Sequence, residues 1–333
     1  MEQVLFGRTG ATISQLGFGT MSFGGEASES ECEALYAAAR DAGVTFFDCA
    51  DVYQKGVAEE ILGALIAPHR DEVVLATKAY FPMSDAPNDR GASRYHLERA
   101  VEASLERLGT DRIDVFFLHR FDERTPLEDS LRGVERLVAA GKILYPAASN
   151  YAAWQVQKAL GIQARHGWAP LAAIQPMFNL VKRTAEIEIL PMAASEGLAV
   201  TPYSPLGGGL LSGKYGKDAR PDAGRVVDNP MYAERYGDAW RFETAERFTA
   251  LAAARGVHPV TLAVAWVAAH PAVTAPLVGA RNVEQLAPAL AAADFEMDDA
   301  LYAEIAALSP APPPATDRNE EAGSHDYATV LRR

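Results

Sequence analysis

Short runs of β-branched and aromatic residues alternate with longer amphipathic stretches along the chain, and this alternation limits the fold more than any other feature. Strands that alternate with helices pair in parallel through right-handed crossovers, so the pattern predicts an α/β fold around a parallel sheet. We expect strands at eight places: Leu16–Gly19, Thr45–Asp48, Val73–Thr77, Val115–Leu118, Ile143–Ala148, Ala173–Pro176, Ala199–Pro202 and Thr274–Leu277.

The stretches between these strands have the spacing of packed helices. For example, Val101, Leu105 and Leu108 fall on one helical face. Gly43 and Gly109 follow two such stretches, where a left-handed residue commonly ends a helix. We expect helices over Glu29–Ala42, Tyr95–Leu108, Leu127–Ala140, Trp154–Ala164 and Leu190–Glu196.

Eight strand–helix units can close into a barrel or form an open, doubly wound sheet. An open dinucleotide-binding sheet carries the pattern G-x-G-x-x-G just after its first strand. Here the first strand is followed by Gly19-Thr20-Met21-Ser22-Phe23-Gly24-Gly25, which does not fit that pattern. We therefore predict a (β/α)8 TIM barrel that takes in residues 1–333 as a single domain.

Three segments depart from the repeat. Val4–Phe6 and Thr12–Ile13 flank a turn, which predicts an N-terminal β-hairpin that caps the bottom of the barrel. The segment from Gly207 to Trp240 predicts a long loop after the seventh strand, of the kind that serves as a lid. Beyond Leu308 the chain is Pro-rich, so we expect residues 309–333 to form a loosely ordered tail.

The charge balance narrows the choice of partners. The chain has 44 Asp and Glu against 31 Lys and Arg, a net charge of −13, which argues against nucleic-acid and anionic-membrane binding. Cys32 and Cys49 form neither a disulfide framework nor a metal-spaced cluster, so we expect no metal. No signal peptide and no run of about 18 apolar residues is evident, which predicts a cytoplasmic protein. The oligomeric state stays open.

Four side chains of different chemistry follow successive predicted strands. Asp48 ends the second strand, and Tyr53 comes five residues later in the sequence DCADVY. Lys78 follows the third strand and His119 the fourth. Because barrel enzymes build their active sites at the C-terminal ends of the strands, we expect these four residues to converge there.

Such a set suits proton transfer to a carbonyl group. A free phenol has a pKa of about 10, and an adjacent Lys78 would lower that of Tyr53. Asp48 would keep the lysine charged, and His119 would hydrogen-bond the carbonyl oxygen. Each residue also has a purely structural explanation, such as rim packing, helix capping or a solvated charge. All four at successive strand ends favour catalysis, with Tyr53 giving a proton while a nicotinamide gives hydride.

The motifs around these residues resemble the aldo-keto reductase family from Leu5 to about Leu308. The resemblance implies a catalytic tetrad of Asp48, Tyr53, Lys78 and His119, and an NADP(H)-dependent reduction of aldehydes or ketones. The motifs that carry it are Phe47-Asp48-Cys49-Ala50-Asp51-Val52-Tyr53 with Glu59-Glu60-Ile61-Leu62-Gly63, Ala76-Thr77-Lys78, and Ser104-Leu105-Glu106-Arg107-Leu108-Gly109-Thr110-Asp111-Arg112-Ile113-Asp114.

The resemblance also implies a cofactor site. Tyr203 would stack on the nicotinamide, and Arg281 would bind a 2′-phosphate, which favours NADP over NAD. Where relatives usually carry a polar stretch, this chain has Ala287-Pro288-Ala289, so we expect an adenine contact to be missing. The full set of expected cofactor contacts is Thr20, Met21, Ser149, Asn150, Gln175, Tyr203, Ser204, Pro205, Leu206, Gly208, Lys214, Gly279, Arg281 and Gln285.

The substrate pocket is expected to include Tyr80, Phe81 and Arg120. Its aromatic wall favours a small carbonyl compound such as an aromatic aldehyde or a keto-sugar. Arg120 would bind an anionic or hydroxyl-rich substrate, or else pair with Asp122. A regulatory subunit that binds nicotinamide, senses redox state and has weak reductase activity is the alternative function. A barrel isomerase ranks last because it leaves Tyr203 and the polar strand ends unexplained.

Overall fold

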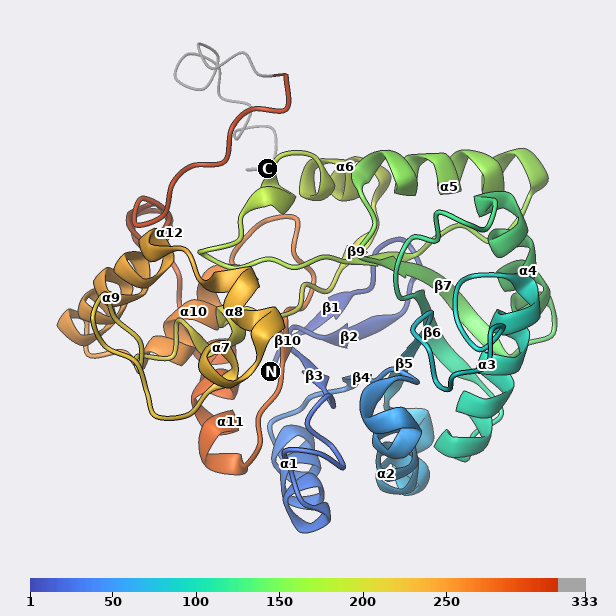
Figure 1. The fold of residues 1–333 in the computed structure, drawn as a ribbon, viewed down its shortest axis with the longest axis horizontal. Coiled ribbons are helices and arrows are strands. Elements are labelled where there is room, and N and C mark those ends of the chain that lie inside the picture. Colours follow the sequence, from blue (N-terminus) through green and yellow to red (C-terminus); the bar gives the residue numbers. More distant parts are fainter. Residues whose placement is uncertain (317–333) are drawn as a thin grey trace.

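A computed structural model describes residues 1–316 (Figure 1). Within them, eight parallel strands pair in the order β10-β3-β4-β5-β6-β7-β8-β9. Backbone bonds from Leu277 N to Pro202 O (2.9 Å) and from Thr274 N to Val200 O (2.8 Å) close the ring, confirming the (β/α)8 barrel. The strands are β3 (Gly17–Gly19), β4 (Phe46–Asp48), β5 (Val74–Ala79), β6 (Ile113–Leu118), β7 (Ile143–Ser149), β8 (Ala173–Gln175), β9 (Ala199–Val200) and β10 (Leu277–Val278).

Helices surround this ring, as Figure 1 shows. Local sequence fixes several of their ends: Ser28 and Glu31 form a capping box at the start of α1, and Gly109, with φ 60°, ends α3. The longer helices are α1 (Glu29–Asp41), α2 (Val57–Ile66), α3 (Arg94–Leu108), α4 (Leu127–Ala139), α5 (Ala153–His166), α6 (Ile189–Glu196), α9 (Ala239–Ala254), α10 (Pro259–Ala268), α11 (Val283–Leu290) and α12 (Asp299–Ala306).

An antiparallel hairpin of β1 (Gln3–Leu5) and β2 (Thr12–Ser14) fills the centre of the ring, as predicted (Figure 1). Its buried Phe6 packs against Phe46 of β4 and Tyr145 of β7, with ring centroids 6.0 and 6.4 Å apart. Most other buried residues around them are small, which leaves room for this plug: Ala76, Ala147, Ala173, Ala199 and Ala275 belong to the same cluster. The hairpin therefore completes the interior core of the barrel.

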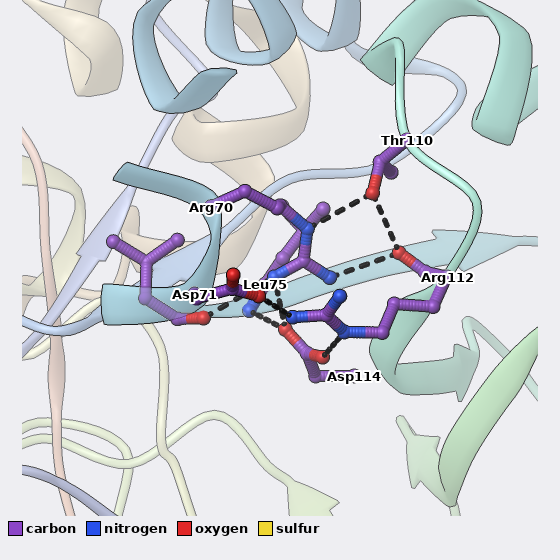
Figure 2. A network of polar contacts seen from close by, with 7 residues as sticks. Arg70, Asp71, Leu75, Thr110, Arg112 and Asp114 are labelled. Atoms are coloured by element: carbon purple, nitrogen blue, oxygen red, sulfur yellow. Dashed lines mark hydrogen bonds and ion pairs between the residues drawn. The ribbon is translucent and has the colours of Figure 1, made fainter. Parts of the chain in front are cut away.

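A polar network ties the 3-10 helix η2 (Ala67–Glu72) to β6 (Figure 2). Its centre is Asp114, which accepts hydrogen bonds from Arg70 at 2.8 Å and from the Leu75 amide at 2.7 Å, and pairs with Arg112 at 3.3 Å. Arg70 also donates to Thr110 at 3.0 Å. Because β6 begins at residue 113, this network braces the N-terminal end of the barrel, away from the predicted site.

The structure differs from the sequence prediction at two places. The segment Gly207–Trp240 is not a plain loop, because it contains η4 (Gly207–Gly209), α7 (Arg225–Asp228) and α8 (Pro230–Tyr236). Asn229 caps α8 through a 3.0 Å bond from the Met231 amide, and Pro230 suits the first helical position. The last strand is β10 rather than Thr274–Leu277, since Pro276 has no N–H to donate to a ladder.

The end of the described chain is anchored on α9. The carbonyl oxygen of Leu308 accepts hydrogen bonds from Thr244 at 3.1 Å and Arg247 at 2.7 Å. Most of the predicted tail, residues 317–333, lies outside the described residues. Among residues 1–316, no single helix has the length and apolar composition needed to cross a membrane; α9 and α10 meet that test only as a pair, bent by 103°.

Candidate active site

A buried ion pair joins the C-terminal ends of β4 and β5. The Lys78 ammonium contacts the Asp48 carboxylate and donates to the carbonyl oxygen of Cys49 at 2.6 Å. The second carboxylate oxygen of Asp48 accepts a bond from the side-chain amide of Gln175, at the end of β8, at 2.8 Å. Both charged side chains are shielded from solvent, so each charge depends on these contacts.

Tyr53 begins the 3-10 helix η1 (Tyr53–Gly56) beside this pair. The Lys78 Nζ atom lies 5.2 Å from the centroid of the Tyr53 ring. The next two residues, Gln54 and Lys55, have positive φ values of 49° and 55°, a conformation that is costly for residues other than glycine. Such strain persists where surrounding structure fixes the backbone, so this turn sets the orientation of the phenol.

The net shift of the Tyr53 pKa is opposite to the direction expected from Lys78 alone. Burial and the nearby Asp48 carboxylate raise the pKa of Tyr53 well above its usual value. Burial is the main cause, and the Lys78 ammonium, which is directed at Asp48 and at the Cys49 carbonyl oxygen, does not outweigh it. Tyr53 is therefore a protonated donor throughout the neutral pH range.

His119 follows β6 directly and faces Tyr53 edge-on, with ring centroids 6.2 Å apart. Burial, assisted by the Lys78 charge, holds the pKa of His119 well below its usual value, so the imidazole is neutral at pH 7. Its Nδ1 atom is buried and has no hydrogen-bond partner within residues 1–316. A neutral imidazole has one donor and one acceptor nitrogen, which suits contact with a carbonyl oxygen.

A second buried carboxyl group lies close to Tyr53. Asp51 is fully buried, and neither of its carboxylate oxygens has a hydrogen-bond partner in the described part of the chain. Burial, followed by repulsion from Glu59, raises the pKa of Asp51 to about 8. Its backbone amide donates to the carbonyl oxygen of Lys78 at 3.0 Å, so this acid is built into the same turn.

The polar residues predicted to bind nicotinamide form one connected group. Tyr203 donates its phenolic hydrogen to the Asn150 side chain at 2.8 Å. The Asn150 amide in turn donates to the carbonyl oxygen of His119 at 2.9 Å, and Ser149 donates to that of Gln175, also at 2.9 Å. The structure thus brings together the residues at the ends of β7, β8 and β9 and joins them to the tetrad.

Thr20 and Met21, after β3, take different positions. Thr20 is buried and donates through both its amide (2.9 Å) and its hydroxyl (3.0 Å) to the carbonyl oxygen of Asp48. Met21 is 38% exposed. Thr20 therefore fixes the backbone of the tetrad aspartate, a role that the sequence did not indicate, while Met21 is accessible to a ligand.

Glycines shape the turn after β9, which continues from Ser204-Pro205-Leu206. Gly207, Gly208 and Gly209 all have positive φ, between 58° and 94°, the region that favours glycine. A Cβ atom at Gly208 would lie 2.7 Å from the Tyr232 ring of α8. The turn is therefore compatible only with small residues, and it leaves its backbone open to close approach.

A group of cations lies beyond this turn. Burial and the charges of Arg281 and Arg225 lower the pKa of Lys214. Arg225, which the sequence reasoning missed because its short helix has no clear pattern, pairs with Glu26 at 3.1 Å. Arg281 lies two residues after Gly279. Its backbone amide donates a hydrogen bond to the Gln285 side chain on α11 at 3.4 Å. Mutually repelling cations fit a ligand with several phosphate groups, as a dinucleotide has.

The substrate-side residues follow β5 and β6. Phe81 packs edge-on against both His119 (4.9 Å) and Tyr80 (5.4 Å). Arg120 is exposed and does not pair with Asp122, which instead accepts bonds from the amides of residues 92 and 124 and from the hydroxyl of residue 125. The predicted ion pair is therefore absent, and Arg120 stays available to a ligand.

A (β/α)8 barrel with a buried Lys–Asp pair, a tyrosine and a histidine at the C-terminal ends of its strands has the architecture of a barrel oxidoreductase. The chain belongs to the aldo/keto reductase family, whose model matches residues 15–310. It is 38% identical to the uncharacterized oxidoreductase YrpG of Bacillus subtilis, over 94% of this chain and 97% of the relative. The chain is accordingly an oxidoreductase, and its family generally uses NAD(P)H.

Other relatives carry more specific names. The chain is 35% identical to a probable voltage-gated potassium channel subunit beta of Oryza sativa, over 88% of this chain and 92% of the relative. It is 32% identical to L-glyceraldehyde 3-phosphate reductase of Escherichia coli O157:H7, over 86% of each chain.

Proposed function

We propose that the protein reduces an aldehyde or ketone to the alcohol with NADPH, and that Tyr53 donates the proton. The observation that carries this proposal is the buried Lys78–Asp48 pair beside Tyr53, with the neutral His119 ring facing the same phenol. A protonated phenol and a neutral imidazole at one strand-end site are suited to a carbonyl oxygen that gains a proton.

The chain offers residues to hold the nicotinamide and the phosphates of the cofactor. Ser149, Asn150 and Tyr203 would hold the nicotinamide, and the cations Lys214, Arg225 and Arg281 would bind the phosphates. When bound, NADPH supplies the hydride. The Arg281 guanidinium suits a 2′-phosphate, and this supports NADP over NAD. Ala287-Pro288-Ala289 of α11 offers no polar side chain for the adenine.

Each member of the tetrad has one task in the proposed reaction. The Tyr53 hydroxyl gives its proton to the substrate oxygen, and the imidazole of His119 orients that oxygen through a hydrogen bond. As the phenol loses its proton, the Lys78 ammonium stabilises the phenolate. Asp48 keeps that ammonium charged and in place, and Gln175 and Thr20 fix Asp48.

The substrate is proposed to be a small carbonyl compound. The rings of Tyr80 and Phe81 beside His119 offer a flat apolar wall, which suits an aromatic aldehyde or a keto-sugar. Both cysteines are free and buried, in keeping with work in the reducing cytoplasm.

The test is the loss of reduced-nicotinamide absorbance when the protein, NADPH and 4-nitrobenzaldehyde are mixed. Tyr53→Phe should abolish turnover while NADPH binding, measured by fluorescence, is retained. Tyr95→Phe, a matched change at a remote residue that is 62% exposed, should leave both unchanged. Turnover that survives in Tyr53→Phe would refute the assigned proton donor.

The names of the channel-subunit relatives favour a second candidate, a redox-sensing regulatory subunit. That role requires tight nicotinamide binding with little turnover of any carbonyl compound. Submicromolar NADPH binding combined with no turnover across aromatic aldehydes and sugars would support the second candidate and reject the first.

A further inference from the structure

The turn after Tyr53 contains three consecutive residues with positive φ. The values are 49° for Gln54, 55° for Lys55 and 99° for Gly56. Backbone of this kind persists only where the surrounding structure holds it. The contacts that hold this turn therefore also fix the position of the Tyr53 phenol.

Arg107 of α3 packs against the last residue of the turn. A Cβ atom at Gly56 would lie 2.6 Å from the Arg107 Cδ atom and 2.8 Å from its Nε atom, so the two residues are in van der Waals contact. The Nε and Nη2 atoms of Arg107 both lie 2.7 Å from one carboxylate oxygen of Glu59 on α2. Nη2 also donates to Ser104 of the same helix at 3.3 Å. These bonds fix the side chain that lies against Gly56.

Glu59 joins this contact to the strand that carries Lys78. Its second carboxylate oxygen accepts a hydrogen bond from the hydroxyl of Thr77 on β5. Successive side chains of a strand point to opposite faces, so Glu59 holds β5 from the helix side, directly behind Lys78. One carboxylate therefore contacts both the support of the Tyr53 turn and the strand of the tetrad lysine.

The burial of this carboxylate calls for an explanation. The Glu59 side chain is 0% exposed and that of Arg107 is 19% exposed. Burying a carboxylate costs free energy, and apolar residues of similar volume often replace a buried ion pair without loss of stability. A carboxylate that accepts two charge-assisted bonds fixes geometry more strictly than apolar packing does, so the pair is suited to setting a position.

We infer that Glu59 and Arg107 are positioning residues for the proton transfer, which hold the Tyr53 turn and the Lys78 strand in place relative to each other. This inference rests on the proposed function, in which Tyr53 gives the proton, and adds two residues to that site. Neither of the two needs to contact the substrate or the cofactor. A misplacement of the phenol by about 1 Å is enough to slow the reaction about a hundredfold.

The first test is Glu59→Gln, which keeps the shape of the side chain and removes its charge. The protein should still fold, because the partly exposed Arg107 guanidinium can turn to solvent. We expect kcat to fall at least about tenfold, while KM for 4-nitrobenzaldehyde and Kd for NADPH stay within about twofold of the wild type. An unchanged kcat would overturn the inference, and so would a raised KM with an unchanged kcat.

Asp114→Asn is the matched control. Asp114 is also a shielded carboxylate that pairs with an arginine, Arg70 at 2.8 Å, but at the other end of the barrel (Figure 2). This variant should lower the stability and leave kcat unchanged. An equal fall of kcat in Asp114→Asn and Glu59→Gln would indicate general loosening of the barrel and would overturn the positioning role.

Two changes at Arg107 separate the charge from the size of the side chain. Arg107→Lys keeps a cation opposite Glu59 and an aliphatic stem against Gly56, so it should retain most of the activity. Glu59→Gln/Arg107→Met removes both charges and leaves no unpaired carboxylate in the interior, and it should be as slow as Glu59→Gln. A wild-type kcat in the double variant would contradict the inference.

The turn can also be perturbed with both charges intact. Gly56→Ala forces the Arg107 side chain away from the turn and should lower kcat. Gly167→Ala is the control, since Gly167 ends α5 at a φ of 67° and has no other atom within 4 Å of an added Cβ. It should leave kcat unchanged, and equal kcat values in the two alanine variants would overturn the inference.

Failure of the reductase function itself has a different signature. If the wild-type protein reduces no carbonyl compound, the phenol is followed by 19F NMR of protein labelled with 3-fluorotyrosine, with the Tyr53 signal assigned from Tyr53→Phe. A Tyr53 signal that shifts or broadens in Glu59→Gln but not in Asp114→Asn supports the positioning role without the reaction. Identical Tyr53 signals in the wild type and Glu59→Gln overturn it.

Discussion

The buried Lys78–Asp48 pair gives a stability prediction whose size follows from its burial. Asp48→Asn removes one charge and leaves the Lys78 ammonium, which is 0% exposed, with only neutral partners such as the Cys49 carbonyl oxygen. Loss of one member of such a pair costs about 3–5 kcal/mol, because the remaining charge is buried without compensation. We therefore expect Asp48→Asn to lower the free energy of unfolding by that amount.

The double variant Asp48→Asn/Lys78→Met should recover most of this loss. Both replacements keep the size of the side chain and remove both charges, and neutral replacement of a buried ion pair is often close to neutral in stability. Only the stability is rescued, since the double variant lacks the ammonium that stabilises a Tyr53 phenolate, and Asp48→Asn lacks the carboxylate that holds this ammonium in place. Both variants should therefore be inactive.

Urea denaturation at pH 7, followed by fluorescence and circular dichroism, measures the free energies, and NADPH oxidation measures activity. A double variant that is as unstable as the two single variants added together would refute the account of a charge-dependent pair. So would a cost below about 1 kcal/mol for Asp48→Asn.

Three other changes have expected outcomes. Arg70→Ala removes the contact with Asp114 and should lower the free energy of unfolding by about 2–3 kcal/mol. Its kcat/KM should stay within about twofold of the wild type, and a large loss of activity would contradict the placement of this network away from the site. Arg281→Ala should reduce the preference for NADPH over NADH about tenfold, and an unchanged preference would rule out its 2′-phosphate contact. Asp51 has a pKa of about 8 in the folded protein against about 3.9 when unfolded, so it costs stability increasingly as the pH rises between these values. Asp51→Asn should therefore stabilise the protein more at pH 8 than at pH 5 in thermal melts, and equal effects at both pH values would contradict the buried-acid assignment.

The sequence pattern was sufficient for the barrel because each strand is a short apolar run followed by a periodic helix. The same regularity brings Asp48, Lys78 and His119 together, since residues at the C-terminal ends of parallel strands meet at one end of a barrel. The prediction failed for the last strand, where Pro276 shifts the ladder by removing a donor. Local composition could not show that shift, because it depends on the partners of the neighbouring backbone.

Side chains outside the repeat were beyond the reach of pattern reasoning. Arg225 lies on a helix of four residues, too short for a periodic signal. The direction of the Tyr53 pKa shift also required the structure, because it depends first on the burial of the phenol and then on the nearby Asp48 carboxylate.

The seam of the barrel has a mechanical consequence. β9 and β10 contain two residues each, and the ring closes between them through only a few backbone bonds, from the amides of residues 274, 275 and 277. Amide hydrogens at this seam should exchange with solvent sooner than those of the longer β6 and β7. Residues proposed to bind the two ends of NADPH follow these two strands, Tyr203 to Lys214 on one side and Gly279 to Arg281 on the other. A bound dinucleotide would then contact residues on both sides of the seam and hold β9 and β10 together. Slower exchange of the Leu277 amide hydrogen when NADPH binds would show this effect.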